Sequence, residues 1–128
     1  MSTASLRARY IGDSIATASP HQLLVMLYDR LALDLERAEA ALELADREAA
    51  RGPLMHAQEI IINLRASLKV EVWDGGPRLA ALYAWLLQEL IQANLKGDIR
   101  RVRDSRKIVE PLRDAWRQAA ASLAAGTA

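Results

Sequence analysis

The sequence predicts an all-α fold, an antiparallel up-down four-helix bundle with an N-terminal arm that caps it. Ala, Leu, Arg and Glu dominate the composition and Phe is absent, which is typical of helical proteins. Apolar residues recur every three or four positions in four long segments, and short turns containing Gly or Pro separate these segments. No segment alternates between apolar and polar residues over the length of a strand. Short connections between amphipathic helices favour antiparallel neighbours, so a bundle is expected.

The first helix is expected to begin at Ser19 and Pro20. Ser19 can cap the helix, Pro20 occupies the first helical position, where its missing N–H costs nothing, and Gln22 completes a capping box. The residues before this start, 1–18, are expected to form the arm. The amphipathic pattern continues to about residue 50, and the pair Gly52-Pro53 is expected to end the helix there.

Two further helices are expected on either side of a glycine-containing turn. The second runs from about Pro53 to Lys69, and its apolar arc is wider than a single core contact needs. The residues of this arc are Leu54, Ala57, Ile60, Ile61, Ile62, Leu64 and Leu68. The pair Gly75-Gly76 predicts a turn, after which the third helix runs from about Pro77 to Leu95 and ends at Gly97.

The fourth helix is expected to begin after Asp98, a favourable N-cap residue. The residues predicted to face the core are Val102, Ser105, Val109, Leu112 and Trp116. Arg100, Arg103 and Lys107 lie on the opposite side, where we expect a solvated surface whose cations meet acidic residues of neighbouring helices. Pro111 removes one helical hydrogen bond, so a bend is expected there before the helix resumes to about residue 123. The bundle is therefore assigned to residues 19–123 and a frayed tail to residues 124–128.

Length, charge and cysteine content limit the function classes. At 128 residues the chain is one domain that can bury its own core, and with no Cys it has no disulfide or thiolate chemistry. A formal net charge of +1 is no basic excess, so nucleic-acid binding is not expected. No apolar run approaches the roughly 20 residues that span a bilayer, and no signal peptide is evident. We therefore expect a cytoplasmic protein without membrane insertion.

The sequence contains no arrangement of residues typical of catalysis. The two histidines, His21 and His56, lack the Glu three residues earlier that a di-metal site in a helix bundle would need. No phosphate-binding glycine motif or nucleophile elbow is present. We expect no enzyme activity, no metal and no cofactor. The wide apolar arc of the second helix has two interpretations, a groove that binds a partner's helix or ordinary core packing.

The segment IATASPHQLLVMLYD, from Ile15 to Asp29, resembles the N-terminal signature of the FliS family of flagellin-specific export chaperones. In that family a Tyr precedes the Ala-Ser-Pro core, and Tyr10 occupies this place. Further similarities follow in the order of the family, over about residues 10–120. They are Ile60-Ile61, Leu64, Ser67-Leu68, Gly75-Gly76, Leu82-Tyr83, Ala93-Asn94-Leu95 and Arg113-Asp114-Ala115-Trp116.

The resemblance implies a cytoplasmic chaperone that uses no ATP. Such a protein binds the C-terminal helical region of flagellin, prevents premature polymerisation and assists delivery to the export gate of the flagellar type III secretion system. The family also has an N-terminal arm that caps an apolar groove and is displaced by flagellin. By this resemblance Tyr10, Ile11 and Ile15 would form the cap. The residues expected in the groove walls are Leu64, Leu68, Tyr83 and Leu87.

One alternative stays open at the level of the sequence. A helical adaptor or regulatory protein could have the same bundle and bind a different amphipathic helix. A component of the export gate is a further expected partner. The sequence does not distinguish a monomer from a weak dimer.

Overall fold

A computed structural model describes residues 20–68 and 74–126 of the chain. Within these ranges all regular structure is helical, and the four helices are α2 (Pro20–Glu43), α3 (Arg47–Ser67), α4 (Gly76–Lys96) and α5 (Ile99–Ala124). Helix α2 packs against α3 and α5, and α4 packs against the same two helices. The predicted four-helix bundle is therefore confirmed, whereas the predicted N-terminal arm lies outside the described residues.

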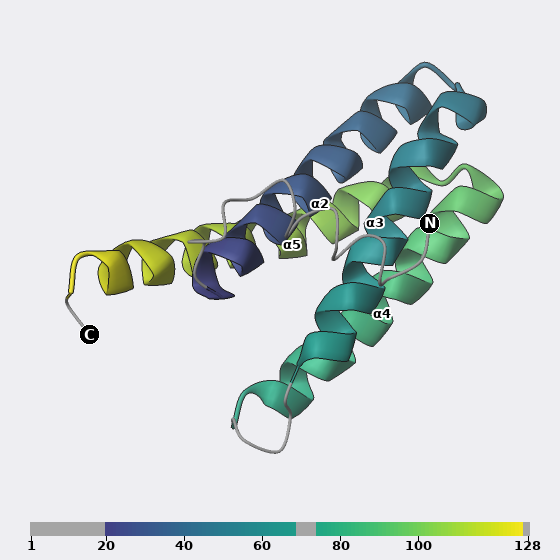
Figure 1. Cartoon of the computed structure of the whole chain (residues 1–128). Helices are drawn as coiled ribbons and strands as arrows, with labels where there is room; N and C mark the ends of the chain where they lie inside the picture. Colours follow the sequence, from purple (N-terminus) through teal and green to yellow (C-terminus); the bar gives the residue numbers. More distant parts are fainter. Residues whose placement is uncertain (1–19, 69–73, 127–128) are drawn as a thin grey trace.

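The helices form two side-by-side pairs, α2 with α5 and α3 with α4 (Figure 1). Ion pairs show that α2 and α5 are antiparallel, because Arg103 contacts Glu43 near one end while Arg117 contacts Asp29 near the other. The two pairs cross, and they diverge at the end that holds the first turns of α2 and α4 (Figure 1).

The predicted end of the first helix at Gly52-Pro53 is wrong. The chain turns earlier, at Ala45, which has a left-handed φ of 55°, and Asp46 then caps α3 by accepting a hydrogen bond from the Ala49 N–H at 3.0 Å. Pro53 consequently lies in the second turn of α3, where it removes one helical hydrogen bond. The Asp46 cap satisfies a free N–H group at the helix start, and that local hydrogen bond fixes the boundary.

The joint between α4 and α5 agrees with its prediction. Gly97 ends α4 with a φ of 62°, a conformation that favours glycine, and a Cβ atom there would lie 2.8 Å from the Arg47 side chain. Asp98 caps α5, because its side chain accepts a hydrogen bond from the Arg100 N–H at 3.0 Å. Both the turn residue and the cap residue were therefore predicted correctly.

Helix α5 continues through Pro111 to Ala124, as predicted, and the expected bend at Pro111 stays a prediction. Pro111 lacks the N–H that would bond to the carbonyl of Lys107. Both residues are exposed, so water can satisfy that carbonyl without an interruption of the helix. A proline on the outer side of a helix is tolerated for this reason.

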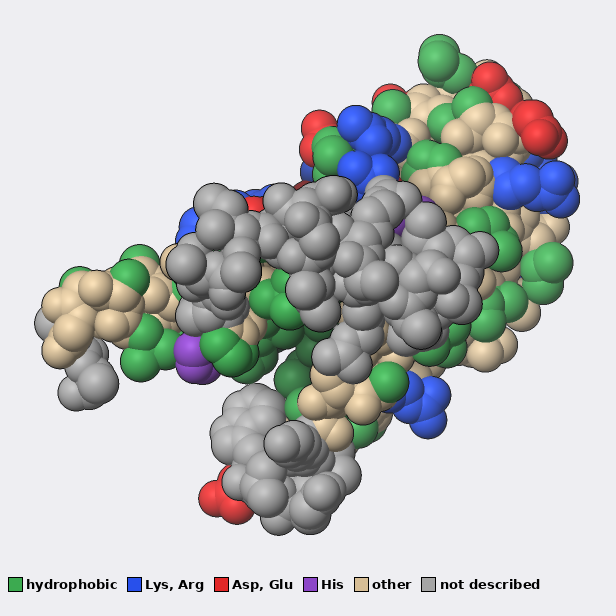
Figure 2. Space-filling model, viewed as in Figure 1, with side chains coloured by type: hydrophobic (Ala, Val, Ile, Leu, Met, Phe, Trp, Pro, Cys, Tyr) green, Lys and Arg blue, Asp and Glu red, His purple; other side chains and the backbone are tan. Residues whose placement is uncertain are grey.

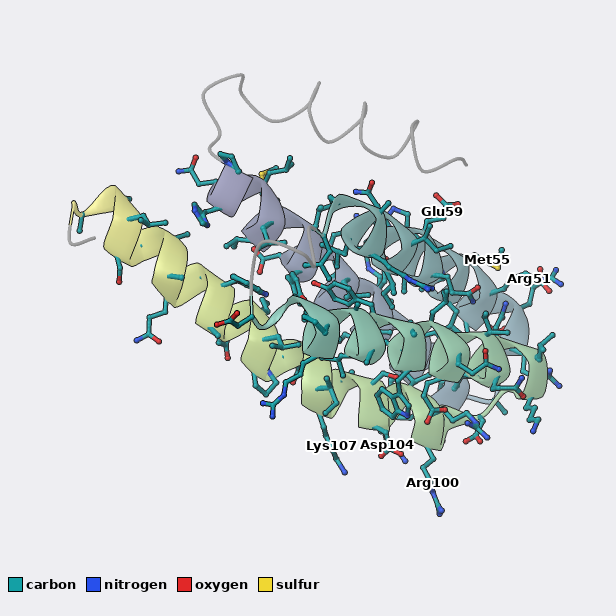
Figure 3. All side chains as sticks on the ribbon, turned by 90° about the horizontal axis from the view of Figure 1, so that it is seen from below. Arg51, Met55, Glu59, Arg100, Asp104 and Lys107 are labelled. Atoms are coloured by element: carbon teal, nitrogen blue, oxygen red, sulfur yellow. The ribbon has the colours of Figure 1, made fainter. Side chains whose placement is uncertain are left out.

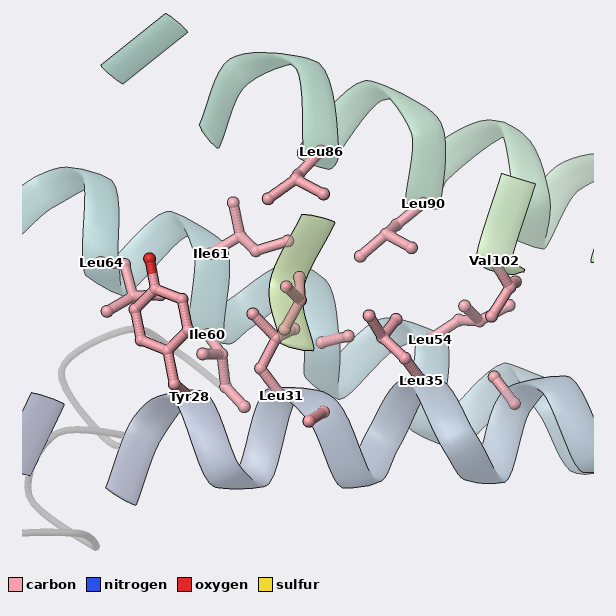
Figure 4. Close-up of a cluster of buried hydrophobic side chains, with 14 of the residues drawn as sticks. Tyr28, Leu31, Leu35, Leu54, Ile60, Ile61, Leu64, Leu86, Leu90 and Val102 are labelled. Carbon is pink, nitrogen blue, oxygen red and sulfur yellow. The ribbon is translucent and has the colours of Figure 1, made fainter. Parts of the chain in front are cut away.

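The core is formed by apolar side chains from all four helices (Figure 4). The labelled residues of this layer are Tyr28, Leu31, Leu35, Leu54, Ile60, Ile61, Leu64, Leu86, Leu90 and Val102. A buried side chain of this size is worth about 1.5–3 kcal/mol relative to exposure, so the layer is the main source of stability. Val102, Ser105 and Val109 are buried as predicted for α5.

A buried carboxylate joins α2 to α3. Asp34 is 1% exposed, and His56 Nδ1 lies in hydrogen-bond contact with its carboxylate. Arg30 Nε lies 3.4 Å from the same carboxylate. Burial raises the pKa of Asp34 above its ordinary value, and His56, Arg30 and Arg37 oppose that rise.

Arg103 and Arg106 of α5 are paired with carboxylates of α2, as predicted for the basic segment, whereas Arg100 and Lys107 form no ion pair within the described residues. Arg103 lies 3.2 Å from Glu39 and 3.3 Å from Glu43, and Arg106 lies 3.0 Å from Glu39. Burial acts to raise the pKa of Glu39. Hydrogen bonds from Arg106 and Arg103 outweigh this effect and hold that pKa below its ordinary value. Glu39 is thus the centre of an ion-pair network between the two helices.

Glu39→Gln is expected to lower the free energy of unfolding by about 0.5–1 kcal/mol at pH 7, since it removes the shared acceptor of two arginines. The folded-state pKa of Glu39 lies below the unfolded value of 4.5. The contribution of Glu39 to the free energy of unfolding is therefore present above pH 4.5 and is lost as the pH falls through the folded-state pKa. Urea unfolding at several pH values measures the difference between the two proteins. Glu43→Gln is the matched control and should cost less, and a pH-independent difference would contradict this assignment.

Candidate protein-binding face

Apolar side chains are exposed along the line where α3 and α4 pack together. On α3, Met55 is 48% exposed and Ile62 is 41% exposed, and on α4 Leu95 is 66% exposed. Leu87 and Ile91 of α4 are partly exposed. We call these five residues the α3–α4 face.

The register of the two helices brings these side chains together. Asn94 Nδ2 lies 3.5 Å from Met55 Sδ, and Arg47 donates a hydrogen bond to the Leu95 carbonyl at 2.6 Å. Ile62 lies two helical turns after Met55 on α3. Leu87 lies two helical turns before Asn94 on α4. The antiparallel register therefore brings Leu87 to the level of Ile62, and Gln58 and Glu59 of α3 lie between Met55 and Ile62.

The solvent side of α4 extends this face without charge. The exposed residues of α4 between Arg78 and Lys96 are Ala81, Ala84, Trp85, Gln88 and Leu95. Glu89, the charged residue in this interval, pairs instead with Arg101 of α5. In a chain with 26% charged residues, an uncharged helix side of this length indicates a contact surface.

Figure 2 shows hydrophobic side chains over α3 and α4, and both basic and acidic side chains at the upper end, near the turn between α2 and α3. A shallow apolar strip between two antiparallel helices is suited to the apolar side of a third amphipathic helix. Within the described residues no cluster of His, Asp or Glu could hold a metal ion. In the same ranges no helix is long and apolar enough to cross a membrane.

The seven residues predicted for partner binding fall into three groups. Leu87 belongs to the α3–α4 face, and Leu68 is partly buried at the end of α3. Leu64 and Tyr83 are buried in this structure, and their expected place in the groove walls stays a prediction. The predicted cap residues Tyr10, Ile11 and Ile15 lie outside the described residues.

Tyr83 is part of the core and forms a polar contact across the bundle. Its hydroxyl lies 2.7 Å from that of Tyr28, and the ring of Tyr28 lies 6.4 Å from that of Trp116. Burial raises the pKa of both tyrosines, and hydrogen bonds to Tyr83 and Trp116 partly oppose the rise at Tyr28. The pair joins α2 to α4, the two helices on opposite sides of the core.

Sequence reasoning missed most of the exposed face, namely Met55, Ile91, Leu95 and the adjacent Trp85. Ile62 was named only as part of the apolar arc of the second helix, which is wider than a single core contact needs. A signal was nevertheless present, because residues 79–88 contain no charged residue at all. A helix without charges on its solvent side would have indicated this surface.

The comparisons with known proteins agree on one family. Residues 2–123 match the family model described as “Flagellar protein FliS”. The chain is 35% identical over 112 residues to the flagellar secretion chaperone FliS of Salmonella typhimurium, an alignment that covers 84% of this chain and 82% of that protein. It is 33% identical over 110 residues to the flagellar secretion chaperone FliS of Bacillus subtilis, covering 86% and 82%.

The fold is also similar to a solved structure titled “Crystal structure of flagellar chaperone from bacteria”. The TM-score is 0.73, the sequence identity is 18%, and the superposition covers 93% of this chain and 98% of that one. At this identity the likeness shows a common fold.

Tyr28→Phe is expected to destabilise the bundle by about 1–3 kcal/mol, because it leaves the buried Tyr83 hydroxyl without its partner. Tyr83→Phe should cost a similar amount, because it leaves the buried Tyr28 hydroxyl without the same partner. The double variant should cost less than the sum of the two single variants, as both polar groups are then removed. Urea denaturation of the four proteins measures this coupling, and strictly additive costs would disprove the hydrogen bond's role.

Proposed function

The chain belongs to the FliS family of flagellar secretion chaperones, and we propose on this premise that it binds the C-terminal helical region of flagellin. It would thereby prevent premature polymerisation in the cytoplasm and assist delivery to the flagellar type III export gate. The α3–α4 face is the observation that supports this proposal, because it is an exposed apolar strip on a rigid helix pair. The family is one of chaperones and not of enzymes.

The physical argument concerns the burial of two apolar surfaces at once. A client helix with one apolar side would cover Met55, Ile62 and Leu95, and its own apolar side would be shielded from other flagellin molecules. Ordering a disordered segment costs several kcal/mol, so a contact spread along the full length of the strip is needed. Binding and release of this kind require no ATP.

The residues that precede α2 are proposed to act on the same surface. Tyr10, Ile11 and Ile15 are apolar or aromatic and could cover an apolar strip in the free chaperone. A cap of this kind lowers the affinity for the client by the fraction of time that it occupies the site. It would also keep the free protein from self-association.

Ile62→Glu and Leu95→Glu are each expected to weaken binding of a flagellin C-terminal segment by about tenfold or more. Each substitution replaces an exposed apolar contact, worth about 1.5 kcal/mol or more when buried by the client, with a charge. Isothermal titration calorimetry measures the affinity, and circular dichroism checks that helicity is retained.

Leu123→Glu is the matched control for these two variants. Leu123 is an exposed leucine near the end of α5, and it lies away from α3 and α4. Its substitution should leave the affinity unchanged. Equal losses in all three variants, or no loss in any, would show that the client does not use the α3–α4 face.

Deletion of residues 1–18 is expected to tighten binding of the same segment, because it removes the competing cap. The affinity should rise by the factor by which the cap reduces access, without a change in the thermal unfolding of the bundle. Calorimetry on the truncated and full-length chains measures the ratio. An unchanged or weaker affinity would argue against a cap and in favour of a direct contact between this segment and the client.

A further inference from the structure

Methionine supplies all the sulfur of this chain. The sequence contains no Cys and three methionines, Met1, Met26 and Met55. Met55 is 48% exposed, whereas Met26 is partly buried in α2 and Met1 lies outside the described residues. Peroxides oxidise a thioether to a sulfoxide, and solvent exposure favours the reaction. Between the two methionines of the described residues, Met55 is therefore the more accessible to an oxidant.

Met55 occupies a position where a change in its polarity alters the α3–α4 face directly. It is one of the five residues of that face, and Asn94, whose amide contacts its sulfur, is adjacent to Leu95 in α4. On α3 it lies one turn from Arg51 and one turn from Glu59 (Figure 3). Met55 thus provides apolar contact area at a point where its neighbours along the helix are charged.

The contact with Asn94 places a hydrogen-bond donor at the sulfur. Asn94 Nδ2 lies 3.5 Å from Met55 Sδ, and a thioether is a weak acceptor. Oxidation converts the side chain into a polar one, with an oxygen that is a stronger acceptor than the sulfur. The amide of Asn94 is already in place to donate to that oxygen and to hold it between α3 and α4.

We propose that Met55 is an oxidation site and that its sulfoxide weakens client binding at the α3–α4 face. This inference rests on the proposed chaperone function and specifies how the same face is regulated. The sulfur attacks one oxygen of hydrogen peroxide, the O–O bond breaks, and the second oxygen leaves as water. Sulfur thereby loses two electrons and peroxide gains them. A methionine sulfoxide reductase reverses the step, since two thiols form a disulfide and the sulfoxide oxygen leaves as water.

The sulfoxide weakens binding because it introduces a polar group into an apolar contact. A client helix on the face must remove water from the sulfoxide oxygen, and the apolar side of that helix offers no hydrogen bond in return. We expect the affinity to fall by about tenfold, the effect of losing one well-buried apolar contact. The bundle should stay folded, since Met55 lies outside the buried core.

The test compares the full chain before and after limited treatment with hydrogen peroxide. Peptide mass spectrometry should find Met55 oxidised about fivefold faster than Met26, in line with its exposure. Calorimetry with the flagellin C-terminal segment should show the loss of affinity, and a methionine sulfoxide reductase with a thiol should restore it. Oxidation of Met26 ahead of Met55, or an unchanged affinity after complete conversion of Met55, would overturn the proposal.

Two substitutions of similar volume locate the effect. Met55→Leu should bind the client as the wild-type chain does and should lose its sensitivity to peroxide. Met26→Leu is the matched control and should keep that sensitivity. If oxidation still lowers the affinity of Met55→Leu, the sensitive group is another side chain, such as the exposed Trp85, and the assignment to Met55 is refuted.

Asn94→Ala tests the contribution of the amide. Without this donor the sulfoxide oxygen can turn from the face into solvent, so oxidation should lower the affinity by a smaller factor than in the wild-type chain. In the wild-type chain the side-chain amide signal of Asn94 should shift in NMR spectra when Met55 is oxidised. An unshifted signal, together with an undiminished effect in Asn94→Ala, would contradict this contact.

The same measurements separate this inference from the proposed function. If the chain binds the flagellin segment equally well before and after oxidation, the inference alone is wrong. If it does not bind the segment in either state, the client assignment is wrong, and the mass spectra and the Asn94 signal still decide whether Met55 is the oxidation site.

Discussion

Burial of one apolar side of each helix in a common interior is the constraint on which the rest of the structure depends. Tyr28, Leu31 and Leu35 of α2 are fully buried between the neighbouring helices, and they fix which side of α2 faces solvent. The same requirement orients α3 and α4 through residues such as Ile61 and Leu86. These two helices have more apolar residues than the interior can accept. The exposed face results from that excess.

The two helix pairs also differ in how they use charge. Between α2 and α5, Glu39 and its two arginine partners form a network that fixes the register of the helices. Between α3 and α4 the polar contacts are few, chiefly Asn94 with Met55 and Arg47 with the Leu95 carbonyl. Individual exposed ion pairs contribute little to stability, so the network mainly specifies pairing. An apolar, unpaired surface on α3 and α4 remains accessible as a consequence.

The fold could be predicted from periodicity and from local capping residues, whereas the site could be predicted only in part. Gly97 and Asp98 act locally, so their roles follow from residue type alone. The turn between α2 and α3 was predicted at Gly52-Pro53 because this pair is a strong turn signal. The residue that caps α3 is Asp46, a weaker signal in the sequence. Tyr83 could not be placed, since its burial depends on Tyr28, fifty-five residues away. Only the packed structure distinguishes a core residue from a groove residue on the same helix.

Folding and the proposed recognition thus depend on different residues of the same two helices. On α4, Leu86 and Leu90 face the core, whereas Trp85 and Leu95 face solvent. A substitution at Leu95 changes the surface and leaves the interior intact, so its effect on a partner can be measured without a loss of fold. A buried residue such as Tyr83 can affect that surface only through the position of its helix.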